Sequence, residues 1–269
     1  MKRVMLRLII YIAASLGLIF LYVKHLEAKS VFFPSKGLQA TPADIDLTFQ
    51  EVYLNTKDGV QIHGWFLPHQ EAKYTLLFCH GNGGNLSSRL DKILILEQAK
   101  VNIFIIDYRG YGLSSGKPKE SGLYLDAKAG YDYLINKKNI KPEQIILYGE
   151  SLGAAVIIDL ASREKVGGLI AEGAFSSGRD IGKVFYPYVP KFILPNILDS
   201  LGKINKIKAP KLFLHSADDE IIPIKLGKKL YQAAPEPKYF VEVSGSHNSI
   251  YSDSENKYLV SIIAFLDKL

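Results

Sequence analysis

Short apolar runs recur along most of the chain. They alternate with stretches whose apolar residues have helical spacing or that are typical of crossover connections. Because most of these runs are continuously apolar, they are typical of strands buried on both faces of a parallel sheet. The first two are joined by the turn "KDG" and indicate an antiparallel start. The pattern predicts an α/β fold, a mostly parallel central sheet with helices on both faces. The runs expected to be strands are residues 50–56, 61–68, 74–80, 102–107, 144–149, 167–173, 211–215 and 238–243.

The N-terminal segment follows a different pattern. It is uncharged from Leu8 to Val23, and Arg7 can snorkel so that the apolar span extends towards Val4. The span therefore has 16 to 20 residues, which is enough to cross a bilayer. A cleaved signal peptide is the alternative, since the basic "MKR" start suits one, but the run is long and no clean A-x-A site follows it. We therefore expect residues 1–29 to form a single-pass membrane anchor and residues 30–269 to form one domain.

Charge and cysteine content narrow the function classes. The net charge is +6, of which residues 1–29 carry +4 and the rest only +2, so no basic face for nucleic acid is expected in the folded domain. Basic residues lie on both sides of the apolar span, and the positive-inside rule only slightly favours a cytoplasmic N-terminus and an extracytoplasmic domain. The single cysteine, Cys79, excludes an internal disulfide and a cysteine zinc cluster.

Two serines lie in the pattern G-x-S-x-G. Ser114 comes well after the run 102–107 and precedes the turn-forming "GKPKESG", which indicates a loop. Ser151 directly follows the run 144–149 and precedes "LGAAVIIDLAS", which suits a buried helix. Strand, sharp turn and helix are the context of a nucleophile elbow, so we expect Ser151 to be the nucleophile. A tight turn with an inert serine is the alternative.

A nucleophilic serine needs a base and a group that orients the base. Of the six histidines, only His247 follows the last apolar strand in a loop near the C-terminus, where this class of site has its base. Asp218 and Asp219 both lie in the turn after the run 211–215, and spacing alone does not choose between them.

The glycine-rich stretch "HGNGGN" follows the run 74–80 at the point where this architecture has its second oxyanion donor. We expect the backbone N–H groups of Asn82 and Leu152 to form the oxyanion hole, and His80 to brace the loop. A phosphate-binding loop is disfavoured because the lysine of G-x-x-x-x-G-K-[ST] is missing.

Six stretches of the chain, taken together, carry a family resemblance: "VFFPS", "HGNGGN", "DYRGYGLSSGKPKESGLYLDA", "GESLGAAV", "SADDEIIP" and "GSHN". On these stretches the chain resembles the Bem46-type α/β-hydrolase family, which is related to the ABHD13 and ABHD17 serine hydrolases. The likeness covers residues 30–269. It implies an α/β-hydrolase fold and a Ser-Asp-His triad of Ser151, Asp219 and His247, with Asp219 chosen by the family pattern D-x-[VI]-[VI]-P. Ser216 and Ser246 stand where the family commonly has glycine.

The resemblance implies acyl transfer through an acyl-enzyme, which needs no metal or organic cofactor. Residues 176–209 are rich in aromatic residues and proline, and we expect them to form a small cap in which Phe185 and Tyr186 contact an acyl chain. Packing on the sheet edge is the alternative for this segment. An apolar cap beside a membrane anchor favours a small-molecule or lipid acyl ester or thioester as substrate. A peptidase of the same fold and a non-catalytic interaction protein are the alternatives.

Overall fold

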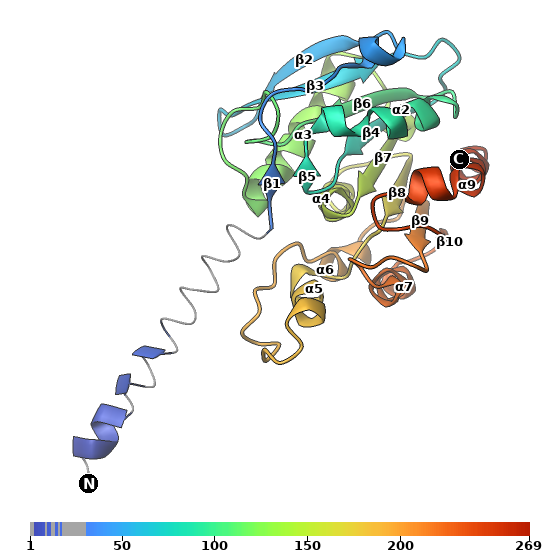
Figure 1. The fold of residues 1–269 in the computed structure, drawn as a ribbon. Coiled ribbons are helices and arrows are strands. Elements are labelled where there is room, and N and C mark those ends of the chain that lie inside the picture. The colour runs from blue at the N-terminus through green and yellow to red at the C-terminus, as the bar shows by residue number, and fades with distance from the viewer. Residues whose placement is uncertain (1–2, 9, 12–13, 16, 18–30) are drawn as a thin grey trace.

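The computed structural model describes residues 3–8, 10–11, 14–15, 17 and 31–269. Within these residues, every run expected to be a strand forms one, and all belong to one sheet (Figure 1). Its strands are β2 (Gln50–Asn55), β3 (Gln61–Leu67), β4 (Thr75–Cys79), β6 (Asn102–Ile106), β7 (Ile145–Glu150), β8 (Gly168–Glu172), β9 (Lys211–Ser216) and β10 (Lys238–Val243).

The strand order in this sheet is β10-β9-β8-β7-β4-β6-β3-β2. β2 pairs antiparallel with β3, and β3 pairs antiparallel with β6, whereas the pairs from β6 through β10 are parallel. The predicted antiparallel start followed by parallel βα units is therefore confirmed. Because β4 and β7 are adjacent, the loops at their carboxyl ends lie side by side.

Helices cover both faces of the sheet. They are α2 (Leu90–Glu97), α3 (Glu120–Asn136), α4 (Leu152–Ala161), α5 (Gly178–Phe185), α6 (Leu201–Ile204), α7 (Ile224–Ala233), α8 (Ile250–Asp253) and α9 (Glu255–Leu266), with the short 3-10 turns η1 (Pro42–Ile45), η2 (Leu86–Arg89) and η3 (Pro142–Gln144). Residues of α3, α4 and α7 pack in one hydrophobic cluster, and residues of α2 and α9 pack in a second one.

The alternation of side chains along a strand explains the two clusters. In β4, Leu77 and Cys79 belong to the first cluster, whereas Leu76 and Phe78 belong to the second. All four side chains are fully buried. Burial of a leucine or phenylalanine side chain contributes roughly 1.5–3 kcal/mol, so a strand that is apolar on both faces is stable only between two helical layers.

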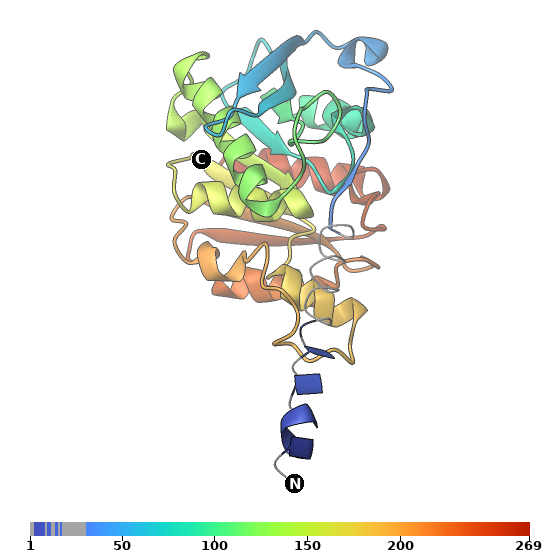
Figure 2. The ribbon, with the colours of Figure 1, turned by 90° about the vertical axis from the view of Figure 1, so that its left-hand side faces the viewer.

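Two smaller features lie around the carboxyl end of the central strands. The strands β1 (Phe33–Pro34) and β5 (Gly83–Gly84) form a short parallel pair that the sequence pattern does not predict. Residues 176–209, here called the cap segment, contain α5 and α6 and connect β8 to β9. Figures 1 and 2 show α5 and the loop that follows it on the side of the domain where α6 and α7 also lie.

Half of the predicted membrane span, residues 4–23, lies outside the described residues. Among the residues that the structure does describe, no helix has both the length and the apolar character that a membrane crossing requires.

Candidate functional site

Ser151 stands at the sharp turn between β7 and α4. Its backbone has φ 52° and ψ −113°, a conformation that costs energy for any residue with a β-carbon. The Ser151 N–H donates to the Glu172 carbonyl at 2.8 Å, which ties the turn to the neighbouring strand. A β-carbon on Gly149 would clash with the Gly153 carbonyl, and one on Gly153 would clash with the Cys79 carbonyl. The pattern G-x-S-x-G thus has a packing reason at this position.

Ser114 has a different environment. It lies in the loop after β6 and is 2% exposed. Its Oγ donates to the Asp107 carbonyl and accepts from the His63 N–H, each at 2.9 Å. The hydroxyl therefore joins the loop to β3, which is a structural role.

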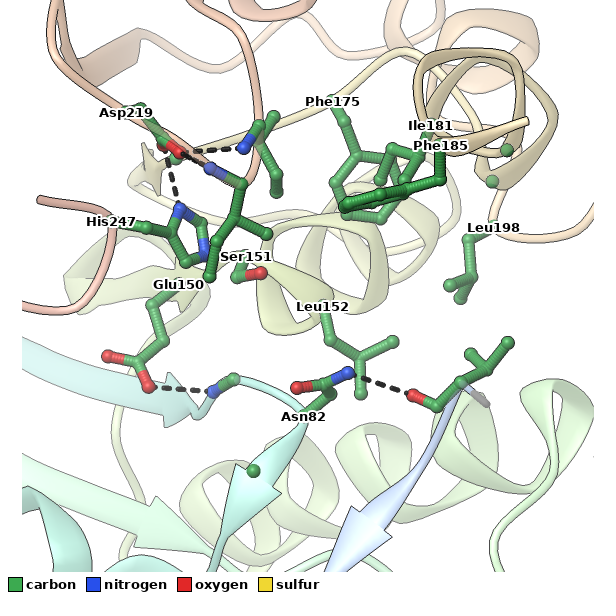
Figure 3. Close-up of a pocket in the computed structure, with 18 of the residues that line it drawn as sticks. Asn82, Glu150, Ser151, Leu152, Phe175, Ile181, Phe185, Leu198, Asp219 and His247 are labelled. Carbon is green, nitrogen blue, oxygen red and sulfur yellow. Dashed lines mark hydrogen bonds and ion pairs between the residues drawn. The ribbon is translucent and has the colours of Figure 1, made fainter. Parts of the chain in front are cut away.

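His247 and Asp219 meet across two loops. The Nδ1 of His247 lies 2.7 Å from Oδ2 of Asp219, and the other carboxylate oxygen accepts from the N–H groups of Ile221 at 3.0 Å and Ile222 at 2.6 Å. Figure 3 shows the His247 ring between Asp219 and Ser151, with its second nitrogen turned towards the serine. Asp218 is exposed, and its backbone N–H donates to Ser216 Oγ at 3.0 Å. Of the two aspartates that spacing alone leaves open, Asp219 is the one that contacts His247.

Electrostatics favour an ionised Asp219. Burial alone raises the pKa of this carboxyl, but the imidazoles of His215 and His247 and the Ile222 N–H outweigh that effect and hold the pKa well below its ordinary value. A carboxylate that stays ionised at neutral pH accepts a hydrogen bond from Nδ1–H of His247 and leaves Nε2 free to accept a proton.

The two N–H groups expected to bind an oxyanion come from two different elements. Leu152 is the first residue of α4, and Asn82 lies in the loop after β4, with both residues at the same pocket as Ser151 (Figure 3). Among the described residues, neither N–H has a backbone carbonyl as hydrogen-bond acceptor. The N-terminal end of a buried helix and a free loop N–H are together suited to a developing negative charge.

The loop that carries Asn82 is fixed by the segment 31–37, here called the strap. The Phe33 N–H donates to the Asn82 carbonyl at 3.2 Å, and the Asn82 side-chain amide donates to the Val31 carbonyl at 3.0 Å. The Tyr111 hydroxyl also donates to the Asn82 carbonyl, at 2.8 Å. These contacts use the carbonyl and the side chain of Asn82 and leave its N–H available.

His80 lies beside this loop, outside the pocket lining. It is fully buried, its Nδ1 lies 2.6 Å from the Gly81 carbonyl, and its Nε2 lies 3.2 Å from Asp107 Oδ1. These contacts agree with a bracing role.

A cavity of about 1540 Å³ opens in front of Ser151. One part is polar and contains Ser151, Asp219 and His247, and the other part is mostly apolar. The apolar lining includes Phe175, Ile181, Phe185, Val189, Ile193, Leu194, Ile197 and Leu198. Most of these side chains belong to the cap segment, which therefore forms much of the apolar wall of the cavity.

Phe185 and Tyr186, the two residues expected to contact an acyl chain, both line the cavity. They are 54% and 51% exposed, so both are about half accessible to solvent. In Figure 3, Phe185 lies beside Phe175 and Ile181 on the side of the cavity away from His247.

A cluster of four charged residues, which the sequence patterns above do not predict, lies beneath this site. Arg89, Lys92, Glu150 and Glu172 line the cavity and form ion pairs with one another. Glu150 and Glu172 each end a buried apolar strand. A carboxylate at the end of such a strand is a signal that could have indicated the cluster.

Comparisons with known proteins find relatives that span most of the chain. The chain is 33% identical over 271 residues to the α/β-hydrolase domain-containing protein WAV2 of Arabidopsis thaliana, which covers 90% of this chain and 88% of that protein. It is 34% identical over 220 residues to protein bem46 of Schizosaccharomyces pombe, covering 78% and 74%.

Family and fold comparisons agree with these relatives. The family described as serine aminopeptidase, S33, matches residues 70–196. An esterase of Pyrococcus furiosus has a similar structure, with a TM-score of 0.75 and 20% identity over 88% of this chain and 98% of that chain. That likeness shows the α/β-hydrolase fold. The identities with WAV2 and bem46 show the family, and the chain belongs to the Bem46/ABHD17-like family of α/β-hydrolases.

Proposed function

We propose that this chain is a membrane-anchored serine hydrolase that cleaves acyl ester or thioester bonds through an acyl-enzyme on Ser151. The observation that carries the proposal is the pairing of His247 Nδ1 with Asp219 Oδ2 at 2.7 Å, beside a serine at a sharp strand-to-helix turn. Membership in a family of α/β-hydrolases supports the reaction class.

In the proposed mechanism, Ser151 Oγ attacks the carbonyl carbon of the substrate while His247 Nε2 accepts its proton. The oxyanion accepts hydrogen bonds from the N–H groups of Asn82 and Leu152. Collapse of this intermediate breaks the bond to the leaving alcohol or thiol, which takes the proton from His247. Water then attacks the acyl-enzyme with His247 again as base, and the acid product and free Ser151 result. Asp219 holds the imidazole in the required tautomer throughout.

The cavity lining supports an acyl group as the recognised part of the substrate. Apolar side chains of the cap segment face the cavity from the side away from His247. Because the leaving group must lie near His247 to receive its proton, an acyl chain would extend beneath the cap segment.

The proposed membrane anchor rests on residues 4–23 of the sequence. We place the catalytic domain outside the cytoplasm on the distribution of basic residues around that span. A hydrolase held at a bilayer meets acyl substrates that are themselves in the membrane, which agrees with an apolar cavity.

A serine peptidase is the second candidate, because the family described as serine aminopeptidase matches residues 70–196. An aminopeptidase needs an anionic group for the substrate's amino terminus. Besides Asp219, which contacts His247, two carboxylates line the cavity, Glu150 and Glu172, and each of these is paired with a cation. This pairing favours the esterase.

A panel of p-nitrophenyl esters and aminoacyl p-nitroanilides separates the two candidates. We expect ester turnover that is lost in Ser151→Ala and anilide turnover at least about 100-fold lower in kcat/KM, a difference of roughly 3 kcal/mol in transition-state binding. Anilide turnover that exceeds ester turnover would favour the peptidase. A folded wild-type protein that hydrolyses neither substrate and does not react with a fluorophosphonate would support a non-catalytic role.

A further inference from the structure

Four charged side chains form a buried cluster between the loop that carries Asn82 and the turn that carries Ser151. Side-chain exposure is 15% for Arg89, 5% for Lys92, 10% for Glu150 and 4% for Glu172. The two cations and two anions balance, so the cluster carries no net charge. Burying such a cluster is costly, and replacing buried ion pairs by apolar residues is often neutral or stabilising. A reason other than stability is therefore needed for its place beside the cavity.

The contacts of Glu150 reach both sides of the proposed oxyanion hole. Glu150 directly precedes Ser151, and its Oε1 accepts the Gly81 N–H at 2.8 Å. Gly81 is in turn bonded to Asn82. The Glu150 side chain thus connects the Gly81 N–H, next to the proposed donor Asn82, to the turn that carries the second proposed donor, Leu152. Figure 3 shows this hydrogen bond below Ser151.

Arg89 holds the other flank of Asn82. Its Nε donates to the same Glu150 oxygen that accepts from Gly81, and its Nη2 donates to the Gly83 carbonyl at 3.1 Å. One ion pair therefore holds the residues on both sides of Asn82, through the Gly81 N–H and the Gly83 carbonyl. A β-carbon on Gly81 would lie 3.0 Å from Glu150 Oε1 and 3.3 Å from Arg89 Nη2, so the pair packs directly against the loop.

Lys92 and Glu172 extend the cluster to the nucleophile. Lys92 bonds to Glu150 Oε2 and lies 2.8 Å from Glu172 Oε1. The Glu172 carbonyl accepts the Ser151 N–H at 2.8 Å, and its side chain accepts from the Tyr258 hydroxyl at 2.9 Å. Each charge thus has protein partners, which argues against a substrate-binding role for the cluster.

We propose that Arg89 and Glu150 are positioning residues that fix the N–H groups of Asn82 and Leu152 at the separation an oxyanion needs. This inference rests on the proposed function. Because the oxyanion is present only in the transition state and the tetrahedral intermediates, these residues act on kcat and leave substrate binding unchanged.

The test compares two conservative variants of the full-length protein, Arg89→Lys and Arg109→Lys. Both keep the positive charge and both lose the planar fork of the guanidinium. Arg109 is the matched control, since it is 2% exposed and paired with Asp58 and Asp126 away from the cavity. Four quantities are measured for each protein: kcat and KM for p-nitrophenyl butyrate, the inhibition constant of an alkyl boronic acid that mimics the tetrahedral intermediate, and the thermal unfolding midpoint.

For Arg89→Lys we expect kcat to fall about 10- to 100-fold, somewhat less than the loss of an entire oxyanion donor, and boronate binding to weaken by a similar factor. KM should change by less than about threefold, because ground-state binding does not use these donors. Arg109→Lys should lose as much thermal stability yet keep kcat within about threefold.

An Arg89→Lys protein that folds and keeps wild-type kcat and boronate affinity would overturn the inference, as would equal losses of kcat in both variants. If Arg89→Lys does not fold, Glu150→Gln is measured in its place, with the same expected results. Wild-type turnover that is abolished in Ser151→Ala establishes the proposed function independently. A wild type without such turnover would overturn both proposals, whereas an active wild type with unaffected variants would overturn the positioning role alone.

Discussion

The Nδ1 of His247 lies 2.7 Å from Oδ2 of Asp219, although the two residues are 28 positions apart and come from loops after different strands. β9 and β10 are adjacent and parallel, so the loops at their carboxyl ends meet at the same edge of the sheet. Gly173 follows β8 and faces the same ring, and a β-carbon there would lie 3.1 Å from its Cε1. The imidazole is thus held from two sides.

Asp219→Asn should lower kcat by orders of magnitude, because the amide favours the wrong tautomer of His247. The same change of the triad aspartate in a serine protease lowers kcat about 10⁴-fold. Asp218→Asn is the neighbouring control and should reduce kcat by less than about threefold, since Asp218 is exposed. Steady-state kinetics on a p-nitrophenyl ester measures both. Equal activities of the two folded variants would remove the case for Asp219.

The depressed pKa of Asp219 predicts a specific pH dependence of stability. A carboxyl whose folded-state pKa lies below its unfolded value, about 3.9, stabilises the fold above that value, and this contribution is lost as the pH falls through the folded pKa. On acidification from pH 7 to pH 3, the wild type should therefore lose more free energy of unfolding than Asp219→Asn. Urea denaturation of both proteins at the two pH values measures the difference. Identical losses would contradict it.

The strap predicts different outcomes for two N-terminal deletions. A chain that begins at Ser30 keeps the hydrogen bonds of Val31 and Phe33 to Asn82, so it should be folded and should hydrolyse short water-soluble esters at the full-length rate. Its activity on acyl substrates in vesicles should fall about 100-fold if the missing residues tether the enzyme.

A chain that begins at Leu38 lacks these hydrogen bonds, and we expect its kcat on short esters to fall about 10-fold or more relative to the chain that begins at Ser30. Ester turnover by the two shortened chains is the comparison, with circular dichroism to verify folding. Equal kcat values would show that the strap does not position Asn82. Equal vesicle activity of the full-length chain and the chain from Ser30 would contradict tethering.

The double change Phe185→Ser and Tyr186→Ser tests the cap segment. Each ring is half exposed, so each lost contact is worth on the order of 1 kcal/mol, and kcat/KM on long-chain esters should fall about 10- to 30-fold. Acetate esters should be affected by less than about threefold. Tyr53→Ser, on the distant strand β2, is a control of equal exposure at 50%. An equal loss on both chain lengths would mean that the segment supports the fold and does not contact the acyl group.

Local patterns predict the parts of this site that depend on neighbours in the chain. The strand before Ser151 and the helix after it appear in the sequence as a β-type run followed by an apolar stretch, and the structure has β7 and α4 there. The loop serine, Ser114, is recognisable because turn residues follow it.

The buried cluster and the strap could not be predicted in this way. Arg89 meets Glu150 across 61 positions, and their contact depends on the adjacency of β4 and β7 in the sheet order. β1 and β5 have two residues each, too few to show a period. Such pairings arise from the tertiary arrangement, which a single sequence does not encode in any local pattern.

The most direct test of the account is the site of covalent modification by a fluorophosphonate. The full-length wild type, Ser151→Ala and Ser114→Ala are each incubated with the probe, and the modified peptide is mapped by mass spectrometry. We predict an adduct on Ser151 in the wild type and in Ser114→Ala, and none in folded Ser151→Ala. The ester turnover of Ser151→Ala should fall to the low residual rate that substrate binding and the oxyanion hole alone support. An adduct on another residue of the wild type, or labelling lost in a folded Ser114→Ala, would contradict the assignment of Ser151 as the nucleophile.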